Sequence, residues 1–182
     1  MYYCFCGKIL FMEENFIRLN YLNLTKLLIE KNISISTMES ATSGQIASLI
    51  TDTPGASAIF KGAYISYSNE EKIRLGVSSK TIETYSVYSK ETACEMANIC
   101  RKDFNVEIGV GITGTMGNID PRNSKASIPG KVFFSISTPS STYSFSCQLE
   151  SKNSRLEYKL AVAQIIYEKL INIVENWSNQ SI

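Results

Sequence analysis

The sequence predicts an α/β fold, a single three-layer α/β/α domain with a mixed sheet. Strand-like and helical segments alternate along most of the chain and a long amphipathic helix ends it, which is the pattern of helices packed on both faces of a sheet. The chain has 182 residues, of which 44% are hydrophobic, enough for one core of ordinary size. We assign residues 15–182 to this domain and residues 1–14 to an N-terminal extension of unknown role.

The first elements follow from hydrophobic spacing. Apolar residues recur near helical spacing from Ile17 to Ile29, and Asn32 is a plausible stop. Branched and small polar residues then indicate a strand, so Ser40 is expected at a strand-to-helix turn. Breakers at 53–55 precede a stretch rich in Ile, Phe and Tyr. The expected elements are a helix over 14–31, strand 33–39, helix 41–52, strand 58–66 and a short helix over 69–75.

The middle of the chain predicts a core helix, a central strand and a long loop. Ser89 opens a helix with one small and apolar face, made of Ala93, Met96, Ala97, Cys100 and Phe104. Residues 106–113 alternate branched residues with glycine, which predicts a central strand that a neighbouring backbone or a ligand approaches closely. Residues 114–129 contain several breakers, and a loop of this length in a compact domain is typical of a functional segment.

The last third predicts a hairpin and a terminal helix. Apolar strands over 131–138 and 142–149 are joined by Pro139-Ser140-Ser141. Ser154-Arg-Leu-Glu157 is a capping box, so the final helix begins there. That helix carries one apolar side, formed by Leu160, Ala163, Ile166, Tyr167, Leu170, Ile173, Val174 and Trp177.

Composition excludes several chemistries. The chain contains no histidine, so it has no Ser-His-Asp triad, Cys-His pair or histidine-ligated zinc. The net charge of +1 argues against a nucleic-acid or anionic-membrane partner. The five cysteines lack zinc-site spacing and suit reduced thiols in the cytoplasm, and the N-terminus lacks the marks of a secretory signal. We expect no bound metal or cofactor.

Ser40 allows two hypotheses. Hydroxyls before a helix usually cap it, and Thr42-x-x-Gln45 matches a capping box. Alternatively Ser40 is a nucleophile, with helix amides nearby for an oxyanion. That hypothesis needs a base, and Lys72 is the candidate, with Lys61 as a weaker rival. A lysine base needs a pKa lowered from about 10.4 to about 7 to 8, which requires burial or a nearby positive charge.

Several motifs together resemble one family. Their order resembles that of the CinA C-terminal domain family, and the resemblance runs from about residue 15 to the terminal helix. The motifs are Met-Glu-Ser-Ala-Thr-Ser-Gly at 38–44, Thr-Asp-Thr-Pro-Gly-Ala-Ser at 51–57, Tyr-Ser-Asn-Glu-Glu-Lys at 67–72, Val-Tyr-Ser at 87–89 and Gly-Ile-Thr-Gly-Thr-Met-Gly at 111–117.

The resemblance implies an amidohydrolase of NAD metabolism that converts nicotinamide mononucleotide and water to nicotinic acid mononucleotide and ammonia. It implies Ser40 as nucleophile, Tyr67 as proton relay and Lys72 as base. Implied substrate-binding residues are Glu39, Thr42, Ser43, Gly44, Asn69, Thr113 and Gly114. The implied partners are a pyridine nucleotide and further copies of the chain, with a homodimer favoured.

The chain departs from the family pattern at several positions. Ser43 replaces a glycine, Ala41 stands where cysteine is common, and the Gly-Asp-Arg signature before the last helix is replaced by residues 151–153. Lys152 or Arg155 could supply the missing positive charge, although a lysine does not reproduce bidentate guanidinium geometry. Two alternatives therefore stay open: a nucleotide-binding module without turnover, and a Ser-Lys amidase with another amide substrate.

Overall fold

The computed structural model describes residues 3–177 and contains a five-stranded mixed sheet of order β2-β1-β3-β4-β5. β1 pairs in parallel with β2 and β3, whereas β4 pairs antiparallel with β3 and β5. The predicted C-terminal hairpin therefore forms the antiparallel half of the sheet. The strands are β1 (Ile35–Glu39), β2 (Phe60–Ile65), β3 (Ile108–Gly114), β4 (Lys131–Ser137) and β5 (Thr142–Gln148).

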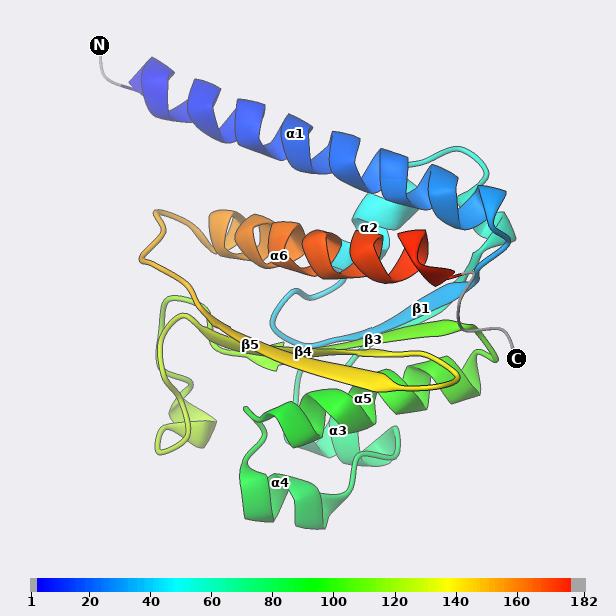
Figure 1. Cartoon of the computed structure of the whole chain (residues 1–182). Coiled ribbons are helices and arrows are strands. Elements are labelled where there is room, and N and C mark those ends of the chain that lie inside the picture. Colours follow the sequence, from blue (N-terminus) through cyan, green and yellow to red (C-terminus); the bar gives the residue numbers. More distant parts are fainter. Residues whose placement is uncertain (1–2, 178–182) are drawn as a thin grey trace.

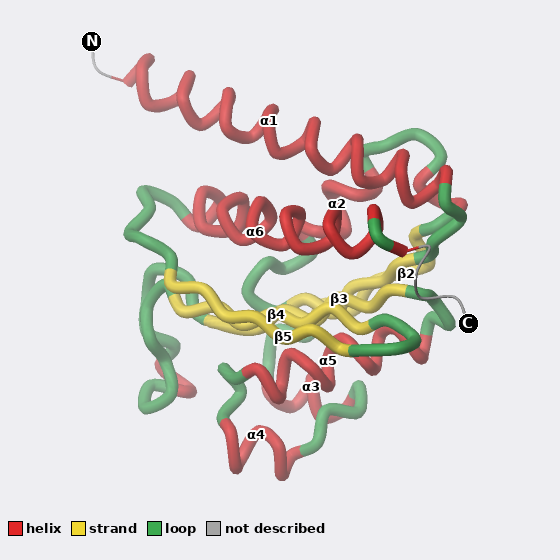
Figure 2. Tube along the Cα trace, in the orientation of Figure 1, coloured by secondary structure: helices red, strands yellow, loops and turns green. Residues whose placement is uncertain are grey.

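Helices cover both faces of this sheet (Figures 1 and 2). One layer contains α1 (Tyr3–Glu30), α2 (Gln45–Thr51) and α6 (Arg155–Glu175). The other contains α3 (Asn69–Arg74), α4 (Ser79–Tyr85) and α5 (Lys90–Asp103). Two short 3₁₀ turns occupy Ala56–Ala58 and Pro121–Asn123. The predicted three-layer α/β/α architecture with a mixed sheet is confirmed.

The winding of the connections around the sheet reverses at β1, and this reversal creates the place for a site. The β1–β2 connection runs through α2 on one face, while the β2–β3 connection runs through α3, α4 and α5 on the other. In such open sheets a crevice forms outside the carboxyl ends of the strands where the winding reverses. Here that crevice lies beyond the ends of β1 and β3.

Two glycines of β3, Gly109 and Gly111, allow helix α5 to pack closely on the strand. A Cβ added to Gly109 would lie 2.2 Å from the Ala97 carbonyl oxygen, and one added to Gly111 would lie 2.3 Å from the Ala93 carbonyl oxygen. Both carbonyls belong to α5, so the backbone of α5 lies directly against the strand. The predicted close approach to the 106–113 strand is therefore made by a helix backbone.

The largest differences from the sequence prediction are the starts of two helices and one helix that was not predicted. Helix α2 begins at Gln45 and not at Ala41, because Ser43 (φ 52°) and Gly44 (φ 88°) have left-handed backbones that cannot continue a helix. Helix α1 begins at Tyr3, so the expected boundary at residue 14 falls inside a continuous helix. Helix α4 was not predicted, because it has no buried residue and thus no apolar periodicity.

Candidate active site

Ser40 lies immediately after β1, at the crevice formed by the winding reversal. Its backbone N–H donates to the Ile112 carbonyl at 3.0 Å, which ties the residue to the end of β3. The side chain is 7% exposed and lines a pocket of about 830 Å³. Ser40 thus has a fixed backbone and a hydroxyl that a ligand can reach.

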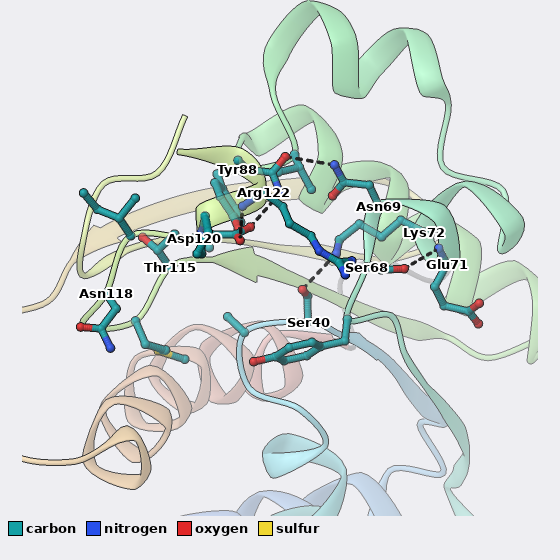
Figure 3. A pocket seen from close by; sticks show the side chains of 18 of the residues that line it. Ser40, Ser68, Asn69, Glu71, Lys72, Tyr88, Thr115, Asn118, Asp120 and Arg122 are labelled. Atoms are coloured by element: carbon teal, nitrogen blue, oxygen red, sulfur yellow. Dashed lines mark hydrogen bonds between the residues drawn. The ribbon is translucent and has the colours of Figure 1, made fainter. Parts of the chain in front are cut away.

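Lys72 comes from α3 and reaches the same point from the other layer. It is only 1% exposed, and its Nζ donates to Ser40 Oγ at 3.0 Å (Figure 3). The same Nζ also donates to the Ser66 carbonyl oxygen at 2.7 Å. The two residues are separated by 32 positions in the sequence. The tertiary fold therefore brings together a hydroxyl and a buried amine.

The environment of Lys72 favours its neutral form more than water does. Burial lowers the pKa of Lys72 from 10.5 to about 8, while the carboxylates of Asp120 and Glu70 act in the opposite direction. At pH 7 to 8 a useful fraction of the amine is unprotonated. The pair can therefore transfer a proton from the serine hydroxyl to the lysine near neutral pH.

The capping hypothesis for Ser40 and Thr42 is wrong. The amides at the start of α2 donate to the Glu39 carboxylate, from Gly44 at 2.8 Å and from Ala47 at 2.9 Å. Thr42 Oγ1 is buried and has no hydrogen-bond partner within the described chain. The helix is thus capped by a carboxylate from the preceding strand.

The four expected substrate-binding residues at positions 39 and 42–44 support the loop and do not line the pocket. Glu39 and Thr42 are fully buried, and the Glu39 carboxylate also accepts a hydrogen bond from Thr37. Ser43 donates from Oγ to the Ser40 carbonyl at 3.3 Å. Their placement explains why Ser40 is held where it is.

Of the other three expected binding residues, two line the pocket and one does not. Asn69 and Gly114 line the pocket, whereas Thr113 is buried beneath it and donates to the Val87 carbonyl at 2.9 Å. Gly114 has φ 148°, and an added Cβ would lie 2.6 Å from the Lys131 carbonyl oxygen. No side chain larger than hydrogen fits at this position.

Tyr67 lines the pocket but does not form a hydrogen bond with the Ser40–Lys72 pair. Its side chain is 63% exposed, and its hydroxyl accepts a hydrogen bond from Arg155 Nη2 at 3.0 Å. Arg155, at the first turn of α6, therefore reaches the pocket, whereas Lys152 does not line it. Of the two candidate replacements for the family arginine, the structure places Arg155 at the site.

The long loop supplies pocket residues that no motif identified. The length of residues 114–129 predicted a functional segment but not which side chains would face inward. The structure places Asp120 and Arg122 of this loop at the pocket, together with Tyr88 from the segment before α5 (Figure 3). Asn123 of the same loop also lines the pocket. None of these residue types has a spacing that would single it out in the sequence.

The side chains of residues 12–177 include no group of three or more His, Cys, Asp or Glu that could hold a metal ion. No helix within the described part of the chain is both long and apolar enough to span a bilayer.

Together the fold and the site define a doubly wound α/β protein with a buried serine–lysine pair in a pocket at the winding reversal. The chain belongs to the CinA family, because the model of the CinA C-terminal domain matches residues 21–173. A CinA-like protein of Flavobacterium psychrophilum is 42% identical over 123 residues, which cover 66% of this chain and 29% of that protein. A putative competence-damage inducible protein of Acetivibrio thermocellus is 46% identical over 93 residues, 50% of this chain and 22% of that one.

This chain thus spans less than a third of the length of these relatives. Solved structures show the same fold. A CinA superfamily protein from Klebsiella pneumoniae has a TM-score of 0.80 at 17% identity, covering 88% of this chain and 99% of that one. The competence/damage inducible protein CihA from Agrobacterium tumefaciens has a TM-score of 0.74 at 25% identity, covering 85% and 95%. The fold is therefore that of the CinA superfamily.

Proposed function

We propose that the chain is a nicotinamide-nucleotide amidohydrolase that converts nicotinamide mononucleotide and water to nicotinic acid mononucleotide and ammonia. The observation that carries the proposal is the 3.0 Å hydrogen bond from the buried Lys72 Nζ to Ser40 Oγ. A serine becomes a nucleophile when an adjacent base accepts its proton, and a lysine acts as that base when burial lowers its pKa. Membership of the CinA family supports the same reaction class.

In the first half-reaction, neutral Lys72 takes the Ser40 proton and Oγ attacks the carboxamide carbon. The Ala41 amide, which follows the nucleophile and lines the pocket, is the proposed donor to the oxyanion. The tetrahedral intermediate collapses, the C–N bond breaks, and Lys72 returns the proton to the leaving nitrogen, which departs as ammonia. An acyl-Ser40 ester remains.

In the second half-reaction, Lys72 removes a proton from water and the hydroxide attacks the ester carbonyl. Collapse of this intermediate breaks the bond to Oγ, Lys72 returns its proton to Ser40, and the carboxylic acid product releases its own proton to solvent to give the carboxylate. Tyr67 stays a proposed relay, and its hydroxyl would leave Arg155 for the reacting groups when substrate binds. Hydrogen bonds in ligand-free sites often tighten only in the complex.

Two positively charged side chains at the pocket favour a phosphorylated substrate. Arg122 and Arg155 line the pocket, and among the side chains of residues 12–177 neither forms an ion pair with a carboxylate. Unpaired guanidinium groups are suited to bind phosphate. A pocket of about 830 Å³ is within the usual size range of small-molecule sites. The proposed ligand contacts also include Asn69 and Gly114. A homodimer and a cytoplasmic location stay predictions.

The test is ammonia release from a panel of pyridine nucleotides, nicotinamide riboside, nicotinamide and simple amides. We expect the mononucleotide to be the best substrate and Ser40→Ala to remove ammonia release without loss of fold. Ser48→Ala, an exposed serine on α2, is the matched control. A Ser40→Ala variant with more than about a tenth of parent turnover, a barrier change of only ~1.4 kcal/mol, would exclude Ser40 as nucleophile. Nucleotide binding without turnover would favour the binding module, and release from other amides only would favour another amidase.

A further inference from the structure

A chain of hydrogen-bonded side chains forms one wall of the pocket. Tyr88 Oη donates to Asp120 Oδ2 at 2.6 Å, and Asn123 Nδ2 donates to the same oxygen at 2.7 Å. Asn69 Nδ2 in turn donates to Asn123 Oδ1 at 3.1 Å. Tyr88 precedes α5, Asp120 and Asn123 belong to the 114–129 loop, and Asn69 opens α3. The network therefore links the loop to the helix that carries Lys72 (Figure 3).

Asp120 is the centre of this network and is charged at neutral pH. Its second oxygen, Oδ1, accepts a hydrogen bond from the Arg122 backbone N–H at 3.0 Å. The hydrogen bonds from Tyr88 and Asn123 hold the pKa of Asp120 below its ordinary value. The pocket thus contains a fixed negative charge from the long loop.

Among the described side chains, no carboxylate lies within hydrogen-bond distance of Lys72. Its two hydrogen-bond partners are the Ser40 hydroxyl and the Ser66 carbonyl, both of which are uncharged. Glu70 is fully exposed, so water screens its charge, and Glu71 is paired with Arg74. The other charged or titratable groups lining the pocket around Lys72 are Asp120 and Arg122 from the loop, Arg155 from α6, and the phenols of Tyr67 and Tyr88. Asp120 is therefore the carboxylate best placed to balance a protonated Lys72.

We propose that Asp120 is a positioning residue for the Ser40–Lys72 pair. Through Asn123 and Asn69 it holds the long loop against α3, and through its charge it stabilises the protonated Lys72 that returns a proton to the leaving nitrogen. The proposal rests on the proposed function, in which Lys72 alternates between base and acid. It assigns a role to a residue of the 114–129 loop, which the sequence indicated as a functional segment only by its length.

The test is a direct titration of the Lys72 side chain by NMR, combined with the pH profile of ammonia release. Asp120→Asn keeps the size of the side chain and removes its charge, so the Lys72 pKa is expected to fall by at least about 0.3 pH units. The acid limb of the activity profile should move by the same amount in the same direction. In Asp120→Glu, which keeps the negative charge, the Lys72 pKa should stay close to its value in the parent protein.

The chain offers a matched control. Asp103 also accepts a hydrogen bond from a tyrosine, Tyr64 Oη at 3.2 Å, but it lies outside the pocket. Asp103→Asn should leave the Lys72 titration and the pH profile unchanged. If Lys72 titrates in Asp120→Asn as it does in Asp103→Asn, the proposed charge role is wrong.

A second variant separates charge from position. Tyr88→Phe removes one hydrogen bond to Asp120 and keeps its charge, so we expect a higher KM with little movement of the acid limb. An unchanged KM would contradict the positioning role. The NMR titration does not depend on turnover, so a parent protein that releases no ammonia would refute the proposed function while Asp120 is still tested.

Discussion

The burial of Lys72 makes a specific prediction about stability and pH. Lys72 is 1% exposed, and burial lowers its pKa from 10.5 to about 8. Between these two pH values the unfolded chain binds more protons at this site than the folded chain, so the free energy of unfolding rises with pH. A lowering of the Lys72 pKa from 10.5 to about 8 corresponds to ~3 kcal/mol in the free energy of unfolding. Burial of the Lys72 amine therefore destabilises the folded protein by this full amount below pH 8, and the destabilisation disappears as the pH rises towards 10.5.

Lys72→Met removes the titration and keeps much of the apolar stem. The substitution also leaves the Ser66 carbonyl without its donor, a cost of roughly 1 to 3 kcal/mol that does not depend on pH. The absolute effect at one pH is thus ambiguous, whereas its change with pH is not. We expect the stability of Lys72→Met relative to the parent to decrease by ~3 kcal/mol between pH 7 and pH 10.5.

Urea denaturation at pH 7, 8, 9, 10 and 10.5 measures this difference, with equal m-values as the check on two-state behaviour. Lys80→Met, at an exposed position on α4, is the control and should show no such trend. A parent–variant difference for Lys72→Met that stays constant within about 0.5 kcal/mol over this range would show that the buried amine does not have a lowered pKa.

Three further predictions concern the pair, its support and the substrate. Lys72→Arg keeps the charge but cannot deprotonate, so ammonia release should fall by roughly 100-fold or more; retained turnover would mean that Lys72 is not the base. Glu39→Ala removes the carboxylate that caps α2, so urea denaturation should show a loss of about 1 to 3 kcal/mol, whereas an unchanged stability with a raised KM would indicate a substrate contact. Arg155→Ala should lower the specificity constant for the mononucleotide but not for the riboside, most strongly at low salt, and Lys152→Ala should not; equal effects on both substrates would remove the phosphate role.

Much of the fold follows from patterns that are local in the chain. Hydrophobic spacing places α5, α6 and the five strands close to their observed positions, because each element buries one face or side. The start of α2 was misplaced because the left-handed backbone of Ser43 is set by the turn around Ser40, and serine carries no signal for that conformation. Helix α4 was not predicted because none of its residues is buried, so its sequence has no apolar face with helical spacing.

The site was predictable only in the residue types that carry its chemistry. The absence of histidine and the ordered motifs pointed to Ser40 and Lys72. Nothing in the sequence indicated that Glu39 caps α2, or that Asp120 and Arg122 face the pocket. These placements depend on how a loop folds over a sheet edge, which local spacing does not encode.

The sequence by itself determined the α/β class, the exclusion of histidine chemistry and the candidate nucleophile and base. Only the tertiary structure decided that Lys72 is buried at 3.0 Å from Ser40, because that distance joins residues 32 positions apart through the winding reversal of the sheet. Burial is a property of everything packed around a side chain, and so is the pKa that follows from it. The reactivity of the pair is therefore a consequence of packing, while the identity of its members is a consequence of sequence.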